Sequence, residues 1–212
     1  KMIKITDEAV ENRVGIGYNP GAGQLEDQFH IDLKILEREE VGEFFRGACR
    51  HYVIQAFCQA QPEKKEDILK EEWMTRINLM WINSQKDNEY FPLHVHKNCA
   101  LSAVMYLNIP EYLPPCKTVD TLADQPSDLI EDGALVFLNN VVQDQTWAKP
   151  NMTLQPMVGD LYIFPRTQQH QVYPFRTADG KGERRSISFN AEFTSKGELD
   201  AFRKQQEEQE PI

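Results

Sequence analysis

The feature that most constrains this chain is the grouping of its histidines, of which there are only five in 212 residues. His94 and His96 stand one residue apart at the threshold of a segment with strand character, and His170 follows a second such segment, residues 159–164. In an extended chain, residues i and i+2 point to the same side, so His94 and His96 can face one ion together. Imidazole is a common ligand of first-row transition metals, so the pattern predicts a metal site. The alternative is that the pair lies on an exposed loop without a ligand.

Composition places the chain among globular proteins. Apolar residues make up 41% of the sequence, which suits one domain with a sizeable core. No apolar run approaches the ~18 residues of a membrane span, and no signal-peptide pattern opens the chain. We therefore expect a cytoplasmic protein that has no membrane partner.

Charge and cysteine content argue against two further classes of protein, nucleic-acid-binding proteins and disulfide- or zinc-stabilised domains. The 33 acidic residues outnumber the 23 basic ones, and the net charge of −10 disfavours nucleic acid as a partner. The four cysteines show neither C-x-x-C spacing nor the density of a small disulfide-rich domain. We expect reduced thiols rather than a zinc site at all four positions, Cys49, Cys58, Cys99 and Cys116.

Helical periodicity appears in three places. Residues 37–61 carry an apolar stripe at three- and four-residue steps, and Pro62 ends the pattern. The stripe consists of Val41, Phe44, Phe45, Ala48, Tyr52, Val53, Ala56 and Phe57. A shorter helix is predicted at 64–72, and a charged helix at 195–209 with Thr194 or Ser195 as its cap.

A period of two dominates the rest of the chain. Strands are predicted at 76–83, 101–108, 134–138, 160–164, 171–174 and 184–193. Irregular stretches separate them at 109–133 and 139–158, and residues 2–32 show weak periodicity around a turn at 15–21. Many short strands without alternating helices favour an antiparallel jelly roll over a doubly wound parallel sheet.

The predicted fold is therefore mainly β, a double-stranded β-helix (jelly roll) with N-terminal helices on the outer face of its major sheet. We expect a single domain over residues 1–212. Residues 1–75 would form a helical support, residues 76–193 the jelly-roll core, and residues 194–212 a C-terminal helix.

The order of several motifs resembles the Fe(II)/2-oxoglutarate-dependent dioxygenase superfamily. The resemblance covers roughly residues 76–193, is closest to the 2-oxoglutarate oxygenases of marine bacteria and their phages, and extends more distantly to prolyl hydroxylases. The motifs are, in order, His94-x-His96, Tyr106-Leu107-Asn108, residues 133–137, residues 159–165, His170-x-Val172-x-Pro174 and Arg184-x-Ser186 continuing to Asn190.

The resemblance implies a role for each matching position. His94 would be the first iron ligand and His170 the distal one. Arg184 would bind the far carboxylate of 2-oxoglutarate with Ser186 as a helper, because a guanidinium fork binds carboxylate bidentately and the two residues share a strand face. Tyr106 would donate a hydrogen bond to the same co-substrate.

Two positions beside this set keep alternatives open. Asn83 could reach the open face of the site, although a capping or turn role is equally compatible with its position. If Arg184 points inward, Arg185 would be solvated, and Ile187 and Phe189 would pack outward under the 37–61 helix. The opposite strand parity would turn Arg185 inward together with Ile187 and Phe189.

The chain departs from the superfamily at His96, where most members have Asp or Glu. We favour His96 as the third iron ligand, which leaves the site one negative charge poorer, so that dianionic 2-oxoglutarate would neutralise Fe(II). The alternatives are that His96 points away and water fills the position, or that Asn98 contributes its side-chain oxygen. Halide occupancy is disfavoured because imidazole is not small.

Other residues near these motifs receive structural assignments. Cys99 is a possible ligand that packing explains equally well, and Trp147 could close over a substrate or be buried against the barrel. His30 and His51 are assigned to structure, because His51 lies beside the helix stripe and His30 has no partner motif.

The function implied is an iron-dependent, 2-oxoglutarate-dependent dioxygenase that hydroxylates a small-molecule or peptidyl substrate and releases succinate and CO2. Two alternatives remain: a three-histidine cupin-like dioxygenase that does not use 2-oxoglutarate, and a non-enzymatic jelly-roll binding module. The identity of the substrate and the oligomeric state are left open by the sequence.

Overall fold

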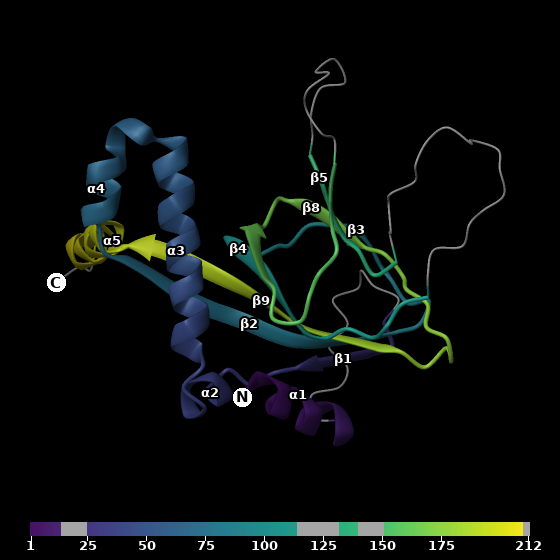
Figure 1. The fold of residues 1–212 in the computed structure, drawn as a ribbon. Helices are drawn as coiled ribbons and strands as arrows, with labels where there is room; N and C mark the ends of the chain where they lie inside the picture. The colour runs from purple at the N-terminus through teal and green to yellow at the C-terminus, as the bar shows by residue number, and fades with distance from the viewer. Residues whose placement is uncertain (14–24, 114–131, 140–150, 210–212) are drawn as a thin grey trace, which may run out of the picture.

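Two antiparallel sheets form the body of the protein, with the smaller sheet on one side of the larger and the N-terminal helices on the other (Figure 1). A computed structural model describes residues 1–13, 25–113, 132–139 and 151–209. In spatial order, the larger sheet contains β1 (Asp27–His30), β2 (Trp73–Lys86), β9 (Glu183–Ser195), β4 (Leu101–Asn108) and β7 (Leu161–Pro165). The smaller sheet contains β3 (Phe91–His94), β8 (Gln169–Val172), β5 (Leu135–Leu138) and β6 (Asn151–Leu154). The predicted double-stranded β-helix is confirmed.

Strand β9 shows how the two faces of the larger sheet differ. Ile187, Phe189 and Ala191 are fully buried on its outer face, where they join the core beneath the helices. The alternate residues Ser186 and Ser188, also buried, face the smaller sheet. Because side chains alternate along a strand, the same thirteen residues of β9 build both the apolar core and a polar inner wall.

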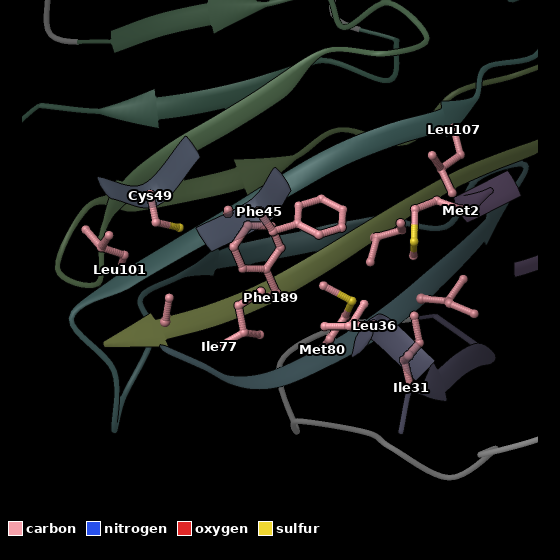
Figure 2. Close-up of a cluster of buried hydrophobic side chains, with 14 of the residues drawn as sticks. Met2, Ile31, Leu36, Phe45, Cys49, Ile77, Met80, Leu101, Leu107 and Phe189 are labelled. Carbon is pink, nitrogen blue, oxygen red and sulfur yellow. The ribbon is translucent and has the colours of Figure 1, made fainter. Parts of the chain in front are cut away.

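The helices are α1 (Met2–Glu11), α2 (Lys34–Arg38), α3 (Gly42–Ala60), the short 3-10 helix η1 (Pro62–Lys64), α4 (Lys65–Lys70) and, at the C-terminus, α5 (Lys196–Gln209). Helices α1, α2 and α3 bury residues in the core on the outer face of the larger sheet, whereas α4 packs against α3 and α5 follows the end of β9 (Figure 1). Figure 2 shows Phe45 of α3 against Phe189 of β9, and their ring centroids are 5.2 Å apart. Across the described residues, no helix is long and apolar enough to span a membrane.

The predicted single helix over 37–61 is wrong at its N-terminal end. The chain leaves helical geometry after Arg38, and Glu40 has a positive φ of 56° before α3 begins at Gly42. Phe44 does not belong to the buried stripe, since 58% of it is exposed. The apolar spacing runs through this break because α2 and α3 both bury residues in the same core.

Other elements differ from prediction mainly in their ends. Helix α5 starts beside Ser195, whose Oγ accepts a hydrogen bond from the Glu198 amide at 3.1 Å while the Glu198 carboxylate accepts one from the Ser195 amide at 3.1 Å. This reciprocal cap identifies Ser195 rather than Thr194 as the capping residue. The sequence pattern did not predict α1, β1, β3 or β6, and β2 (Trp73–Lys86) extends beyond both ends of the strand predicted at 76–83. The turn at 15–21 and most of the two long connections lie outside the described residues.

Candidate active site

Three histidines converge between the sheets. His94 ends β3 and is paired in register with His170 on the neighbouring strand β8. The ring centroids of His94 and His170 are 4.1 Å apart, and the His96 ring is 5.3 Å and 5.2 Å from them. One ligand nitrogen from each ring lies within 4.8 Å of the other two. This spacing is compatible with a single shared metal ion.

His96 reaches this point from the loop after β3. Its backbone amide donates to the Arg166 carbonyl at 2.9 Å, and its Nε2 lies 3.4 Å from Nε2 of His170. The ring therefore turns toward the other two imidazoles rather than away from them. Cys99 is buried next to this loop but is not among the metal-ligand groups that converge in the described part of the chain.

Backbone contacts orient two of the rings. Nδ1 of His94 lies 2.8 Å from the Pro92 carbonyl, and Nδ1 of His170 lies 2.9 Å from the Gln168 carbonyl. Each Nδ1 must carry the proton to donate these hydrogen bonds, which leaves the lone pair on Nε2. Metal-binding histidines are commonly held in this way.

Burial keeps the three rings neutral. It lowers the pKa of His170 to about 4, with a further contribution from His94. Burial also lowers the pKa of His96 to about 3, assisted by repulsion from His170 and His94. The pKa of His94 is lowered by burial as well, against the opposing effect of its hydrogen bond to Pro92. Neutral imidazole is the form that binds a metal ion.

The histidines open into an inter-sheet cavity of about 540 Å³. Its apolar lining includes Trp81, Phe91, Leu135 and Phe164. Its polar lining comes largely from β2, β4 and β9 of the larger sheet. No Asp or Glu lines the cavity in the described ranges. The volume falls within the ~300–1,000 Å³ typical of small-molecule sites.

Arg184 is the buried cation of this cavity, with 4% of its surface exposed. Its guanidinium donates to the Gly133 carbonyl and to Oε1 of Gln85, and lies 5.4 Å from the centre of the Tyr106 ring. In the described ranges, no carboxylate forms an ion pair with it. A buried guanidinium without an anionic partner is suited to bind a carboxylate ligand.

Tyr106 and Ser186 lie beside Arg184 and line the same cavity. They are register partners on β4 and β9, and both are almost completely buried. Burial raises the pKa of Tyr106, against the opposing effect of Arg184. Tyr106 therefore keeps its hydroxyl proton at neutral pH and can donate it in a hydrogen bond.

Asn83 also lines the cavity, but its side chain is already engaged. Its Oδ1 accepts from Gln28 at 2.7 Å, and its Nδ2 donates to Ser188 Oγ at 3.0 Å. These bonds fix the amide across β1, β2 and β9, so the structure gives Asn83 a bracing role at the cavity wall.

Arg185 points to the opposite side of the sheet. It forms ion pairs with Asp7 and, at 2.7 Å, with Glu183, and only 12% of its side chain is exposed. The alternative with Arg185 inward is wrong, and so is the expectation that Arg185 is solvated. The cause is α1, which the sequence pattern did not predict and which supplies Asp7. His30 and His51 do not line the cavity, and Trp147 lies outside the described residues.

Three functional candidates on the cavity wall were not expected from the sequence: Trp81, Gln85 and Asn190. A signal was available for all three, because Trp81 and Gln85 share strand parity with Asn83. Asn190 likewise shares parity with Arg184 and Ser186.

Comparison with known proteins gives a family match. Residues 79–190, more than half of the chain, match the family described as "Putative 2OG-Fe(II) oxygenase". No curated protein matches the sequence.

Solved structures show more distant likeness. A Pseudomonas putida prolyl-4-hydroxylase is 18% identical, with a TM-score of 0.43 and coverage of 89% of this chain and 83% of that one. A viral collagen prolyl hydroxylase of Paramecium Bursaria Chlorella virus-1, solved with 2OG, is 13% identical, with a TM-score of 0.43 and coverage of 89% and 87%. A 2OG-Fe(II) oxygenase family protein of Burkholderia pseudomallei is 15% identical with a TM-score of 0.39, over 59% of this chain and only 48% of that one.

The cofactors of the matched family are Fe(II) and 2-oxoglutarate. The three-histidine group fits iron, and the buried guanidinium of Arg184, which forms no ion pair within the described residues, fits a dicarboxylate. The family match over residues 79–190 establishes that this chain belongs to the 2OG-Fe(II) oxygenase family.

Proposed function

We propose that this protein is an Fe(II)- and 2-oxoglutarate-dependent dioxygenase that hydroxylates a small-molecule or peptidyl substrate. The observation that carries the proposal is the presence, in one cavity, of three converging neutral imidazoles and one buried guanidinium that has no carboxylate partner among the described residues. The first group suits a divalent metal ion and the second suits the far carboxylate of the co-substrate.

His94, His96 and His170 would hold the metal. Because the Nδ1 protons of His94 and His170 are bound to backbone carbonyls, their Nε2 atoms are presented to the ion without a change of tautomer. Three protein ligands would leave room at the metal for the co-substrate and dioxygen.

Arg184 would anchor 2-oxoglutarate, with Ser186 and the protonated Tyr106 hydroxyl beside it. The guanidinium is held in place by Gly133 and Gln85, so little side-chain freedom is lost when the carboxylate binds. Asn83 braces the wall through Gln28 and Ser188.

The metal and co-substrate would supply the oxidising chemistry: dioxygen would be consumed, 2-oxoglutarate would become succinate and CO2, and one oxygen atom would enter a substrate C–H bond. The chain contributes positioning and exclusion of water. Trp81 and Phe164 flank the His96 ring at 6.0 Å and 6.2 Å between ring centroids and form an apolar wall at the metal position.

The test is spectroscopic. Under nitrogen, protein mixed with Fe(II) and 2-oxoglutarate should develop a weak visible charge-transfer band. His170→Ala should abolish this band. The matched control is His51→Ala, which should leave the band unchanged because His51 is an exposed residue of α3. Absence of the band in the wild-type protein, together with unaltered iron affinity in His170→Ala, would refute the proposal.

A second candidate is a cupin-like dioxygenase that binds its substrate directly to a three-histidine iron centre. It is favoured by the lack of a carboxylate beside the three histidines in the described residues. This candidate predicts that Arg184→Met leaves metal binding and oxygen consumption intact, whereas the first proposal predicts loss of 2-oxoglutarate binding.

A further inference from the structure

We propose that the end of the cavity remote from Arg184 binds a carboxamide group of the substrate, through Asn78, Ser102 and Asn190. This inference rests on the proposed function, because a substrate must bind beside the metal on the side that 2-oxoglutarate leaves open. All three residues line the same cavity as the histidines.

The position of the subsite follows from strand β9. Arg184 and Asn190 lie on the same face, six residues apart, a span of about 20 Å at roughly 3.3 Å per residue. The His96 ring contacts Trp81, whose register partner is Ser188, between these two ends. The metal position is therefore flanked by the Arg184 end and the Asn190 end of one wall.

Asn190 and Ser102 carry polar atoms that the rest of the protein does not satisfy. Oδ1 of Asn190 and Oγ of Ser102 have no hydrogen-bond partner among the described residues, although Asn190 is only 7% exposed and Ser102 only 1%. The two residues are register partners on β9 and β4, so their side chains are neighbours. Buried polar groups without partners are costly and uncommon in native proteins, and they often mark a ligand site.

Asn78 completes the cluster from strand β2. The β2–β9 register passes from Ile77 opposite Ala191 to Leu79 opposite Asn190, so Asn78 is the extra residue of a β-bulge next to Asn190. Its Nδ2 donates to the Asn98 carbonyl at 3.2 Å, and its Oδ1 lacks a partner in the described part of the chain. Bulges commonly redirect side chains beside active sites.

The chemistry of this end selects a neutral group that both donates and accepts hydrogen bonds. Free amide and hydroxyl oxygens call for a donor. A carboxylate would lack a buried cation here, because Lys97, the lysine of the cavity lining, is exposed to solvent. An ammonium group would need an anion, and no acidic side chain lines the described cavity wall. A planar carboxamide can pair with the Asn190 amide through two parallel hydrogen bonds, which an alcohol cannot do.

The experiment uses the full chain loaded with Mn(II) and N-oxalylglycine, an unreactive analogue that occupies the 2-oxoglutarate site. Butanamide, butanoate and 1-butanol are the probes, and Mn(II)-induced relaxation of their protons is measured by NMR against a Zn(II)-loaded reference. We expect butanamide to relax at least fivefold more strongly than either of the other probes.

Variants assign this effect to residues. Asn190→Leu should remove the preference for butanamide, whereas Asn108→Leu should keep it, because Asn108 lies at the exposed end of β4 outside the cavity. Asn190→Asp provides a second variant of nearly unchanged shape, and it should admit butylammonium in place of butanamide.

The outcomes separate the two proposals. The carboxamide subsite would be overturned if the three probes relaxed equally, or if the butanamide effect were undiminished in both Asn190 variants. In either case, Mn(II) binding that depends on N-oxalylglycine would leave the proposed function standing. Failure of the wild-type protein to bind Mn(II) would overturn both.

Discussion

At the scale of single residues, the charge at the metal position depends on His96. Three neutral imidazoles carry no charge, and Arg184 is the buried cation of the same cavity. In a site with two histidines and one carboxylate, the acid offsets half of the charge of Fe(II). Here that offset must come from 2-oxoglutarate, so the metal and the co-substrate should stabilise each other.

We therefore predict strong coupling between metal and co-substrate binding. N-oxalylglycine should raise Mn(II) affinity by about 10- to 100-fold, within the ~5- to 150-fold range usual for coupled sites. His96→Asp should bind Mn(II) more tightly alone and show weaker coupling, because it supplies a negative charge. Calorimetric titration of Mn(II) with and without the analogue measures both effects. Equal affinity in the two titrations of the wild-type protein would contradict this account.

Arg184 and Arg185 form a matched pair for testing the carboxylate anchor. Arg184→Met should weaken 2-oxoglutarate binding by roughly 10- to 100-fold, because hydrogen bonds to charged groups contribute about 1.5–3 kcal/mol. Arg185→Met should leave that affinity within about twofold, since Arg185 faces Asp7 and Glu183 on the other side of the sheet. Titration of 2-oxoglutarate followed by the visible band separates the two variants, and similar losses in both would refute the assignment.

At the scale of elements, α3 is held to the outer face of the larger sheet through a few side chains. Phe45 is 1% exposed and packs edge-on against Phe189 of β9, whereas its neighbour Phe44 is 58% exposed. The inner wall that carries Arg184 and Ser186 is the reverse side of the same strand. Packing of α3 therefore supports the strand on which the site is built.

The two phenylalanines give a direct test of this support. Phe45→Ala should lower the free energy of unfolding by about 3–5 kcal/mol, as expected for a large buried side chain. Phe44→Ala should change it by no more than about 0.5 kcal/mol. Urea denaturation followed by tryptophan fluorescence compares them, and equal losses would show that α3 is not anchored as the structure indicates.

Period-two alternation was enough to predict the major strands, because β4 and β9 each have one buried apolar face. The same alternation placed Arg184 and Ser186 on one side of β9. Strands β3 and β6 have only four residues each and mix apolar residues with Pro92, His94, Asn151 and Thr153, whereas the equally short β5 is apolar throughout. The break at Glu40 was hidden because apolar spacing continues across it.

The converging histidines were predictable, and so was part of the cavity wall, since Tyr106, Arg184 and Ser186 line it as expected. The His94-x-His96 spacing and the motif order indicated the three imidazoles. The bulge at Asn78 and the ion pair between Asp7 and Arg185 depend on contacts across distant segments, which local patterns do not encode. That the chain forms a single domain stays a prediction.

At the scale of the whole molecule, burial of the histidines links stability to pH. Burial lowers the folded-state pKa of His170 to about 4, while an unfolded histidine titrates near ~6.5. The linked contribution to stability is complete above that unfolded pKa. It is lost as the pH falls from about 6.5 toward 4, because only the unfolded chain takes up the proton.

Each such histidine should cost up to about 1.4 kcal/mol per pH unit inside this window. The metal-free wild-type protein should therefore lose stability between pH 6.5 and pH 5.5, and His170→Gln should lose less. Urea unfolding at the two pH values checks the difference. Identical pH dependence in the two proteins would mean that His170 is not held neutral by the fold.

The central claim is that three imidazoles of this chain share one metal ion. X-ray absorption at the iron edge of the anaerobic protein with Fe(II) and 2-oxoglutarate tests it most directly, because multiple scattering from the rings counts bound imidazoles. We predict three imidazoles in the wild-type protein and two in His96→Ala. Two imidazoles in the wild-type spectrum, unchanged in His96→Ala, would contradict the claim.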